Sequence, residues 1–442
     1  MVQSANCCEP MQEPVGTLVM LVFIGTYLAI SSEKVNRAAM SMTGMGFAGL
    51  VLLGFGTSFT DLVHNIEWTT ILFLVSMMAI VAVAGQSGMF QYIALTLAKP
   101  TGGNTSRLFT VFIVFVFIVS IVFDTTSTML IMGPLTIEVC KALEIDFKPF
   151  LITEAITANF ASIPSIVGAV PNLVIAESVY KLGVVSFNAG FLFIVMMPLS
   201  VMLLIVTLFI LQRIFKEKLC DTSDEIVEEV FVVTPQHMIR SRSDFYVSLA
   251  AIAILTLAFT FGQGSGLEPA LVAIIVAFVV LIMTRSRVEN ILSQINWNTV
   301  FFLIGIFGLV AALEIVGFID DIELFVGNIV SGNLGGAVTF LVWVPALLSA
   351  VIDNIPVSVV LAPIAANLAS ITPIFPAILV FAVNVGGYVL PIGAPANIIA
   401  MAMAENEHDP ISFKAFAMIA TPLAMLHLLI GTGWLFLMSL VV

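Results

Sequence analysis

Long apolar runs separated by short polar loops dominate this chain. Each run is long enough to cross about 30 Å of hydrocarbon, or most of it where the helix is interrupted. We expect spans at 15–30, 43–58, 67–85, 148–182 (interrupted), 187–212, 244–262, 268–283, 297–318, 374–404 (interrupted) and 414–440. The pattern therefore predicts an all-α polytopic membrane protein with about 11 transmembrane spans.

Two further apolar segments, 107–143 and 335–372, carry an aspartate in their middle, Asp124 and Asp353. A carboxylate inside a membrane costs roughly 2.5–3.5 kcal/mol on insertion scales, and by default it marks an ion or substrate path. Each segment is long enough for two helices joined by a polar tip. We therefore expect two re-entrant helical hairpins in addition to the spans.

The basic residues predict how the chain crosses the membrane, because short loops rich in Lys and Arg stay in the cytoplasm. With both hairpins re-entrant, every Lys and Arg except Lys181 falls on the cytoplasmic side. This arrangement places both termini outside, hairpin 107–143 on the cytoplasmic side and hairpin 335–372 on the outer side. The charge rule fixes orientation, but it does not fix how deep the hairpins reach.

An internal repeat relates the two halves of the chain. Residues 66–74 match residues 295–303, and the match continues through Gly88 with Gly317, Asp124 with Asp353, Asn159 with Asn384, Gly168 with Gly393, and Asn172 with Asn397. The predicted orientation runs the two copies in opposite directions, as in many secondary transporters. We expect an N-terminal segment and first span (1–42), repeat 1 (43–213), a cytoplasmic linker and connecting span (214–267) and repeat 2 (268–442).

Composition agrees with the membrane assignment and excludes several functions. Of 442 residues, 60% are hydrophobic and only 10% are charged, whereas about a quarter are charged in soluble proteins. A net charge of −13 gives no basic face for nucleic acid. Cys7, Cys8, Cys140 and Cys220 show no zinc or disulfide spacing. No Walker A motif is present, and the acidic Met1–Gln12 does not resemble a signal peptide, so 15–30 is expected to be a retained span.

The candidate site combines the two polar tips with the two helix breaks. Gly and Pro stop the helix at each break, and the broken ends expose N–H and C=O groups that can bind ions. No Lys or Arg falls inside these segments, which favours a small cation or a neutral oxyacid. The candidate binding residues are Asp124, Thr125, Thr126, Ser127, Asn159, Ser162, Gly168, Asn172, Asp353, Asn354, Pro356, Asn384, Gly386, Gly387, Gly393 and Asn397.

Asp124 and Asp353 have a simpler interpretation as N-caps of the helices that follow them, and capping does not exclude function. Desolvation favours the protonated form of a carboxyl group, so each is also a candidate for proton exchange. Na⁺ at Asp124, Asp353, Asn354 and Asn384 is the metal hypothesis, and no other cofactor is expected. Glu154 is a weaker candidate along the path, and His427 is expected to be a packed side chain.

At these motifs the chain resembles the ion transporter superfamily of arsenite permeases, sodium/proton antiporters, the P protein and citrate/dicarboxylate carriers. Asp353-Asn354-Ile355-Pro356 is similar to the Asp-Asn-x-Pro of the arsenite permease and antiporter branch. In the first break, Ala158-Asn159-Phe160-Ala161-Ser162 and Gly168-Ala169-Val170-Pro171-Asn172 depart from the family pattern, which has a Gly pair and an Asp. The resemblance implies a homodimer in a cell membrane.

These observations predict a secondary transporter rather than an enzyme, moving a small ion or oxyacid with H⁺ or Na⁺ as coupling ion. Sodium/proton antiport and arsenite efflux are the favoured types, and citrate or dicarboxylate uptake is the alternative. An intramembrane aspartyl protease would use Asp124 and Asp353 as a pair, but its Gly-x-Gly-Asp motif is absent. A passive channel is the third class, distinguished by flux that does not saturate.

Overall fold

The computed structural model describes residues 13–31, 35–184, 186–219, 235–261, 269–284, 288–318, 334–369 and 372–441, and the regular elements within these ranges are all helices. The first half contains α1 (Glu13–Ser31), α2 (Arg37–Gly54), α3 (Phe59–His64), α4 (Trp68–Gln86), α5 (Met89–Ala98), α6 (Thr105–Val122), α7 (Thr125–Ala142), α8 (Lys148–Ala161), α9 (Val170–Lys181) and α10 (Ala189–Ile214).

The second half contains α12 (Arg242–Phe261), α13 (Pro269–Met283), α14 (Val288–Ser293), α15 (Trp297–Ile315), α17 (Leu334–Ile352), α18 (Asn354–Leu368), α19 (Ile374–Gly386), α20 (Pro395–Asn406) and α21 (Phe413–Ser439). Short 3₁₀ turns include Lys99–Thr101, Pro235–Met238 and Pro391–Gly393.

Helix length and composition confirm a polytopic membrane protein. Among the described helices, 7 are long and apolar enough to cross a membrane, and shorter apolar helices add to them. Large apolar side chains such as Leu28, Ile194, Phe278 and Leu429 are exposed on the outer faces. Such a surface suits contact with lipid, where side chains are as apolar as their surroundings.

The predicted breaks lie where the sequence placed them. The segment 107–143 divides into α6 and α7 at Asp124, and the segment 335–372 divides into α17 and α18 at Asp353. The two interrupted spans divide between α8 and α9 and between α19 and α20. Some features differ from expectation. The helices α3, α5 and α14 were not predicted. The helix α2 begins at Arg37 rather than at 43, because the Asn36 side chain accepts a hydrogen bond from the Ala39 N–H at 3.0 Å and caps it.

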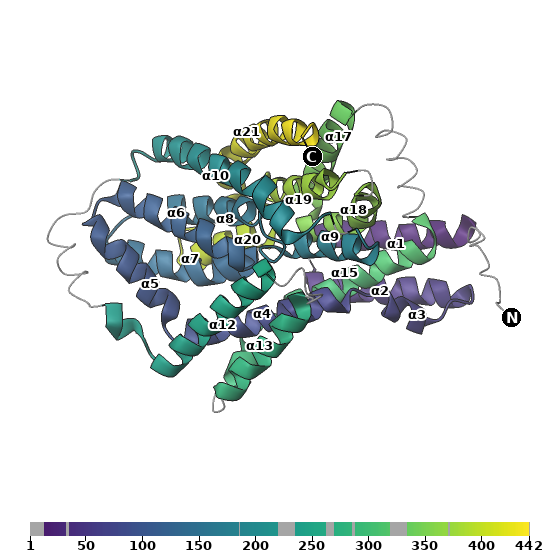
Figure 1. Cartoon of the computed structure of the whole chain (residues 1–442), viewed down its shortest axis with the longest axis horizontal. Coiled ribbons are helices and arrows are strands. Elements are labelled where there is room, and N and C mark those ends of the chain that lie inside the picture. Colours follow the sequence, from purple (N-terminus) through teal and green to yellow (C-terminus); the bar gives the residue numbers. More distant parts are fainter. Residues whose placement is uncertain are drawn as a thin grey trace.

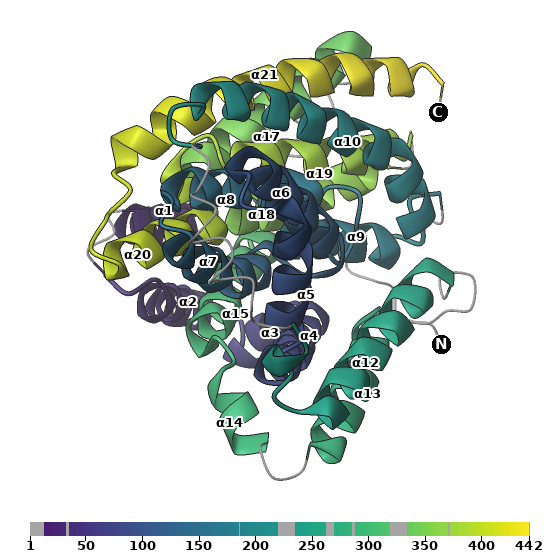
Figure 2. The ribbon, with the colours of Figure 1, turned by 90° about the vertical axis from the view of Figure 1, so that its left-hand side faces the viewer.

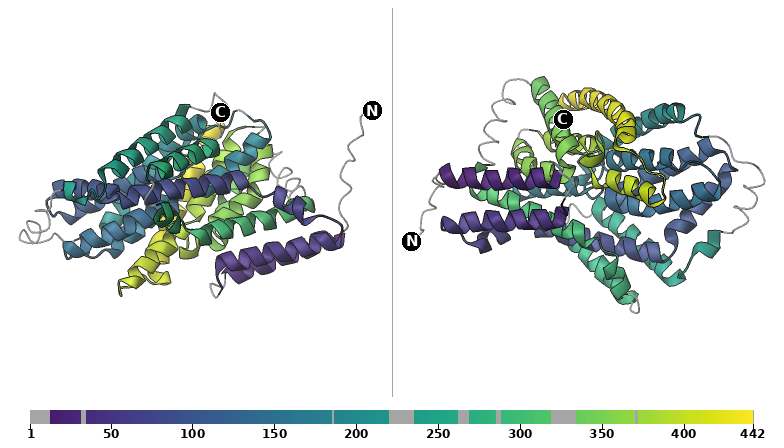
Figure 3. Two further views of the ribbon diagram at one scale, coloured as in Figure 1. Left: turned by 90° about the horizontal axis from the view of Figure 1, so that it is seen from below. Right: turned by 180° about the vertical axis from the view of Figure 1, so that it is seen from behind.

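The helices form two groups that pack against each other (Figures 1 and 2). We call α1, α2, α4, α12, α13 and α15 the outer bundle, in which α2 packs on α15 and α13 packs on α4. We call α6–α10 and α17–α21 the inner bundle, in which α6 and α7 pack on α8, and α17 and α18 pack on α19. Figure 3 shows α1 and α2 lying at one end of the molecule. The candidate residues all belong to the inner bundle.

Several matched positions of the two halves adopt the same local geometry. The indole N–H of Trp68 donates to the Val63 carbonyl at 3.0 Å, and that of Trp297 donates to the Leu292 carbonyl at 3.2 Å. Gly88 and Gly317 have φ values of 83° and 78°, a conformation that favours glycine. The repeat thus extends to individual hydrogen bonds. Its inverted orientation in the membrane, and the domain boundaries, stay predictions; most of the linker and residues 319–333 lie outside the described ranges.

Candidate transport site

Four buried asparagines connect the two helix breaks. Asn159 lies in the last turn of α8 and Asn384 in the last turn of α19, and the amide of each donates to an asparagine of the other half. The Asn159 Nδ2 lies 3.3 Å from the Asn397 Oδ1, and the Asn384 Nδ2 lies 2.6 Å from the Asn172 Oδ1. All four side chains are fully buried. The crossed pairs hold the breaks of the two halves together at the centre of the inner bundle.

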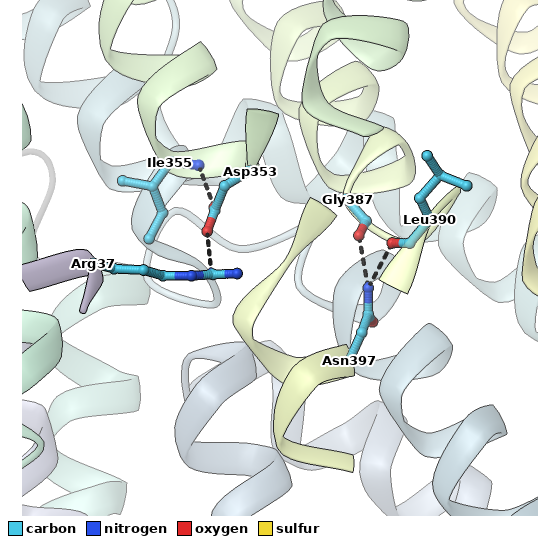
Figure 4. A network of polar contacts seen from close by, with 6 residues as sticks. All are labelled: Arg37, Asp353, Ile355, Gly387, Leu390 and Asn397. Carbon is cyan, nitrogen blue, oxygen red and sulfur yellow. Dashed lines mark hydrogen bonds and ion pairs between the residues drawn. The ribbon is translucent and has the colours of Figure 1, made fainter. Parts of the chain in front are cut away.

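The second member of each pair closes its own break. The Asn172 Nδ2 donates to the carbonyls of Ser162 and Ser165 at 2.9 and 2.8 Å. The Asn397 Nδ2 donates to the carbonyls of Gly387 and Leu390 at 2.8 and 3.3 Å (Figure 4). These carbonyls lie past the ends of α8 and α19, where helical partners are missing. The asparagines therefore stabilise the broken backbone.

Three of the candidate glycines serve close packing of the backbone. A Cβ atom on Gly168 would lie 2.7 Å from the Ser120 carbonyl oxygen, and one on Gly393 would lie 2.8 Å from the Ser349 carbonyl oxygen. A Cβ on Gly386 would collide with the backbone of Ala346. Only glycine fits these places, which explains their presence without a direct role in binding.

One side of the asparagine cluster has unsatisfied oxygens. The Ser162 hydroxyl donates its one hydrogen to the Asn159 carbonyl at 2.7 Å and lies 3.2 Å from the Asn384 Oδ1. Gly387 stands at the position equivalent to Ser162 and offers no hydroxyl. Among the described residues, neither the Asn159 Oδ1 nor the Asn354 Oδ1 accepts a hydrogen bond. A Cβ on Gly387 would lie 3.3 Å from both the Asn159 Oδ1 and the Asn354 Nδ2, so these two side chains converge on this glycine.

The first tip is a self-contained helix cap. Asp124 accepts hydrogen bonds from the Thr126 and Ser127 N–H groups at 3.0 and 3.1 Å and from the Ser127 hydroxyl at 2.5 Å. Thr125 is buried beside it. Asp124 also lines a narrow pocket with Val167 and Ala169 of the first break. The tip thus lies against the break of its own half, with its carboxylate satisfied locally.

The second tip depends on another helix. Asp353 accepts one hydrogen bond, from the Ile355 N–H at 3.2 Å, and its Oδ2 lies 3.6 Å from the Arg37 Nη1 of α2 (Figure 4). Its φ of 76° is rare for a residue other than glycine. Asn354 and Pro356 are buried in the first turn of α18. This tip therefore carries an ion pair that the first tip lacks in the described part of the chain.

Arg37 corrects the expectation that no basic side chain approaches the site. The sequence placed it in a cytoplasmic loop before a span at 43–58. The helix begins six residues earlier, so Arg37 lies in its first turn and reaches Asp353. Asn36, a favourable N-cap residue, was the signal that could have moved the predicted helix start.

The two aspartates do not form a pair. Within the described residues, the groups that interact with Asp124 are those of its own tip, and those that interact with Asp353 include Arg37 but not Asp124. No group of three His, Cys, Asp or Glu side chains able to hold a metal occurs in these ranges. The arrangement does not supply the facing carboxylates that an aspartyl protease needs, and Na⁺ at the predicted residues stays a prediction.

A cavity of about 370 Å³ reaches the first tip from the surface. It lies between α4 and α5 on one side and α7 on the other, and Ser127 at the tip lines it together with Gln86, Gln91, Glu138 and Arg240. The lining is partly polar along its length. This cavity thus ends at the residue that hydrogen-bonds Asp124.

The weaker candidates lie apart from the asparagine cluster. Glu154 is buried on α8, and its Oε1 accepts a hydrogen bond from the Thr136 hydroxyl of α7 at 2.6 Å. The ring of His427 contacts the Tyr388 hydroxyl through Nδ1 at 2.7 Å and the Thr207 hydroxyl through Nε2 at 3.3 Å. His427 is packed and hydrogen-bonded, as predicted.

Comparison with known proteins gives several relatives described as transporters. The chain is 28% identical over 90% of its length to an uncharacterized transporter of Mycobacterium tuberculosis, of which it covers 93%. It is 27% identical over 96% of its length to a 46 kDa membrane protein of Mycobacterium leprae, covering 99% of that protein. It is 25% identical over 95% of its length to the P protein of Mus musculus, covering 60% of it.

The fold is shared with a solved transporter. The YdaH transporter of Alcanivorax borkumensis matches with a TM-score of 0.60 over 95% of this chain and 98% of that one, at 15% sequence identity. The two chains thus share an overall fold. The model of the citrate transporter family matches residues 27–377. The chain is a multi-pass membrane transporter that belongs to the citrate transporter family.

Proposed function

We propose that this transporter is a secondary active one that moves a small ion or oxyacid by alternating access and couples this movement to Na⁺ or H⁺. Sodium/proton antiport or efflux of an oxyacid such as arsenite is the favoured type. The observation that supports the proposal is the pair of buried oxygens, Asn159 Oδ1 and Asn354 Oδ1, which accept no hydrogen bond from described residues. Asp353 precedes Asn354, and its Oδ2 likewise accepts none.

Buried polar oxygens are normally satisfied, and an unsatisfied group costs about 1–3 kcal/mol. Hard cations such as Na⁺ take neutral and carboxylate oxygens as ligands. A dehydrated Na⁺ beside Gly387 would satisfy the Asn159 Oδ1, and it would satisfy the Asn354 Oδ1 once the Asn354 amide turns this oxygen, in place of its Nδ2, toward Gly387. The repeat does not reproduce this set in the other half, where the Ser162 hydroxyl lies 3.2 Å from the Asn384 Oδ1. One cation beside Gly387 is therefore the favoured arrangement.

Uptake of citrate or a dicarboxylate is the second candidate. Two observations favour it: the family match to a citrate transporter and Arg37 near the second tip. A guanidinium group binds carboxylates well. In this alternative, the coupling cation would occupy the same oxygens and the substrate would bind beside it.

A flux panel in proteoliposomes tests the proposal. Purified protein is assayed with Na⁺, arsenite and citrate, each with and without a pH gradient, beside Asn354→Ala. The control is Asn188→Ala, because Asn188 caps α10 at the Phe191 N–H (2.9 Å) away from the cluster. We expect coupled flux of one substrate, reduced by at least about tenfold in Asn354→Ala only. Equal flux in both variants would reject the site, and flux that does not saturate would indicate a channel. The homodimer implied by the resemblance is tested separately, by the mass of the detergent-solubilised protein.

A further inference from the structure

The two bundles are joined at the second tip by an ion pair. Arg37 begins α2 of the outer bundle, whereas Asp353 precedes α18 of the inner bundle, and 3.6 Å separates the Nη1 from the Oδ2 (Figure 4). The Asp353 side chain is 8% exposed and that of Arg37 is 30% exposed. The carboxylate is thus buried, while the guanidinium remains partly in contact with the surroundings.

The contact neutralises charge without completing a hydrogen bond. A charge-assisted N–H···O bond measures about 2.7–2.9 Å, so 3.6 Å is too long for one. The Asp353 Oδ2 accepts no hydrogen bond from other described residues either. Tyr27 of α1 also interacts with Asp353 electrostatically, so that Tyr27 and Arg37 are the ionisable side chains of the described residues around this carboxyl group. The charge of Asp353 is therefore balanced by an ion pair that contains no hydrogen bond.

We propose that Arg37 is a displaceable countercharge, which neutralises Asp353 until a small monovalent cation, Na⁺ or H⁺, takes its place. This inference rests on the cation site proposed above and adds a residue to it. A carboxylate carries one negative charge, and a second cation arriving at it is repelled by the guanidinium. Binding of Na⁺ or H⁺ therefore weakens the attraction between Asp353 and Arg37, and with it one tie between the bundles.

The first tip lacks such an ion pair in the described part of the chain. Asp124 has its interactions within its own tip, through Thr126 and Ser127. In the described residues no basic side chain pairs with it. Coupling of a tip carboxylate to the outer bundle is thus a property of the second half, although the two tips occupy matched positions in the repeat.

Cation binding to the purified full-length protein tests the inference. Thermal unfolding in detergent is followed at increasing NaCl, with choline chloride as the control for ionic strength. We expect the half-saturating Na⁺ concentration to fall about tenfold in Arg37→Gln, equivalent to about 1.4 kcal/mol, because the competing charge is gone. Arg37→Met must behave like Arg37→Gln, and Arg37→Lys should stay near the wild type.

Two controls separate competition from a structural role. Lys181→Gln breaks a surface ion pair with Glu67 (2.5 Å) and should leave the Na⁺ response unchanged. Asp353→Asn should abolish the response in both the wild-type and the Arg37→Gln background. A residue that merely stabilises the fold would lower the unfolding temperature without improving Na⁺ binding.

The same titration identifies the cation. If stabilisation follows pH and not Na⁺, H⁺ is the cation, and its midpoint should move to higher pH in Arg37→Gln, since a positive charge no longer opposes protonation. Unchanged responses to both Na⁺ and pH, or weaker Na⁺ binding in Arg37→Gln, would overturn the inference. If flux needs Asn354 but these curves coincide, only the role of Arg37 fails. If Asn354→Ala keeps full flux, the proposed site fails.

Discussion

The two helix tips occupy matched places in the repeat but are stabilised in different ways. Asp124 has an ordinary φ of −63° and accepts three hydrogen bonds within its own tip. Asp353 has a φ of 76°, accepts one hydrogen bond and faces Arg37 of the other bundle. A cap satisfied locally is insensitive to movement around it, whereas a carboxylate neutralised across an interface changes when that interface moves. The repeat preserves the order of the helices, whereas the backbone and the side-chain contacts of the two tips differ.

Removing the carboxylate charge at each tip should give the largest difference in coupled flux between the two halves. Asp353→Asn should reduce coupled flux by about 100-fold, because the coupling cation loses the charged ligand of the proposed site. Asn has the same shape as Asp, so the substitution adds no steric strain at the φ of 76° and ψ of 142° of this residue. Asp124→Asn should cost less than about tenfold, since its Oδ1 can still accept from the Thr126 and Ser127 N–H groups.

Initial flux rates in proteoliposomes, at equal protein incorporation, measure this difference. Normal size-exclusion profiles for both variants are the control for folding. Equal losses at the two positions would show that both carboxylates work in transport and would remove the distinction drawn between the tips.

Exchanging the equivalent residues Ser162 and Gly387 tests whether the two sides of the asparagine cluster differ in cation binding. Gly387→Ser would place a hydroxyl where it can donate to the Asn159 Oδ1, with its Cβ about 3.3 Å from neighbouring atoms. We expect the half-saturating Na⁺ concentration to rise about tenfold, because the Asn159 Oδ1 would accept a hydrogen bond and would no longer be free to coordinate Na⁺. Ser162→Gly removes the hydroxyl that lies 3.2 Å from the Asn384 Oδ1 instead and should change Na⁺ binding by less than about threefold. The reciprocal variants serve as each other's control, and a larger effect of Ser162→Gly would move the cation site to the first half.

The sequence predicted the architecture better than the site. Apolar runs gave the helices, and the Gly- and Pro-rich stretches gave the breaks, because length and helix-stopping residues act locally. The matched Asn159, Asn172, Asn384 and Asn397 were singled out by the repeat, and they do meet. The crossing between halves, in which each asparagine donates to the other half, depends on tertiary packing and leaves no local signal.

Arg37 shows why the long-range contacts of the site could not be predicted from the sequence. Its loop assignment followed from a hydrophobic run that starts at residue 43, whereas the capped helix extends past that run into polar residues. Its partner Asp353 is more than 300 positions away in sequence. Contacts of this kind arise from the packing of α2 near the second tip, which no periodicity encodes.

Backbone conformation at the tips should appear as a difference in stability. Replacing an N-cap by Ala costs about 0.5–2 kcal/mol, and replacing it by Gly costs less. At position 353 the positive φ strains Asp and Ala alike by about 1–3 kcal/mol, and Gly relieves this strain. The difference in unfolding free energy between the Ala and the Gly variant should therefore be larger at position 353 than at position 124. Thermal unfolding of the four variants measures it, and equal gaps would show that the tip at 353 relaxes to an ordinary conformation.

The smallest expected effect checks that the halves are equivalent away from the tips. Trp68 and Trp297 each donate one indole hydrogen bond to a backbone carbonyl at the start of a matched helix, at 3.0 and 3.2 Å, and each is about half exposed. Replacing either with Phe should cost about 0.5–1.5 kcal/mol of unfolding free energy, the usual contribution of one hydrogen bond. Because the two environments match, the costs should agree within about 0.5 kcal/mol. Agreement in thermal unfolding would confine the divergence of the halves to the tips and breaks, whereas a clear inequality would mean that matched geometry does not imply matched energy anywhere in this repeat.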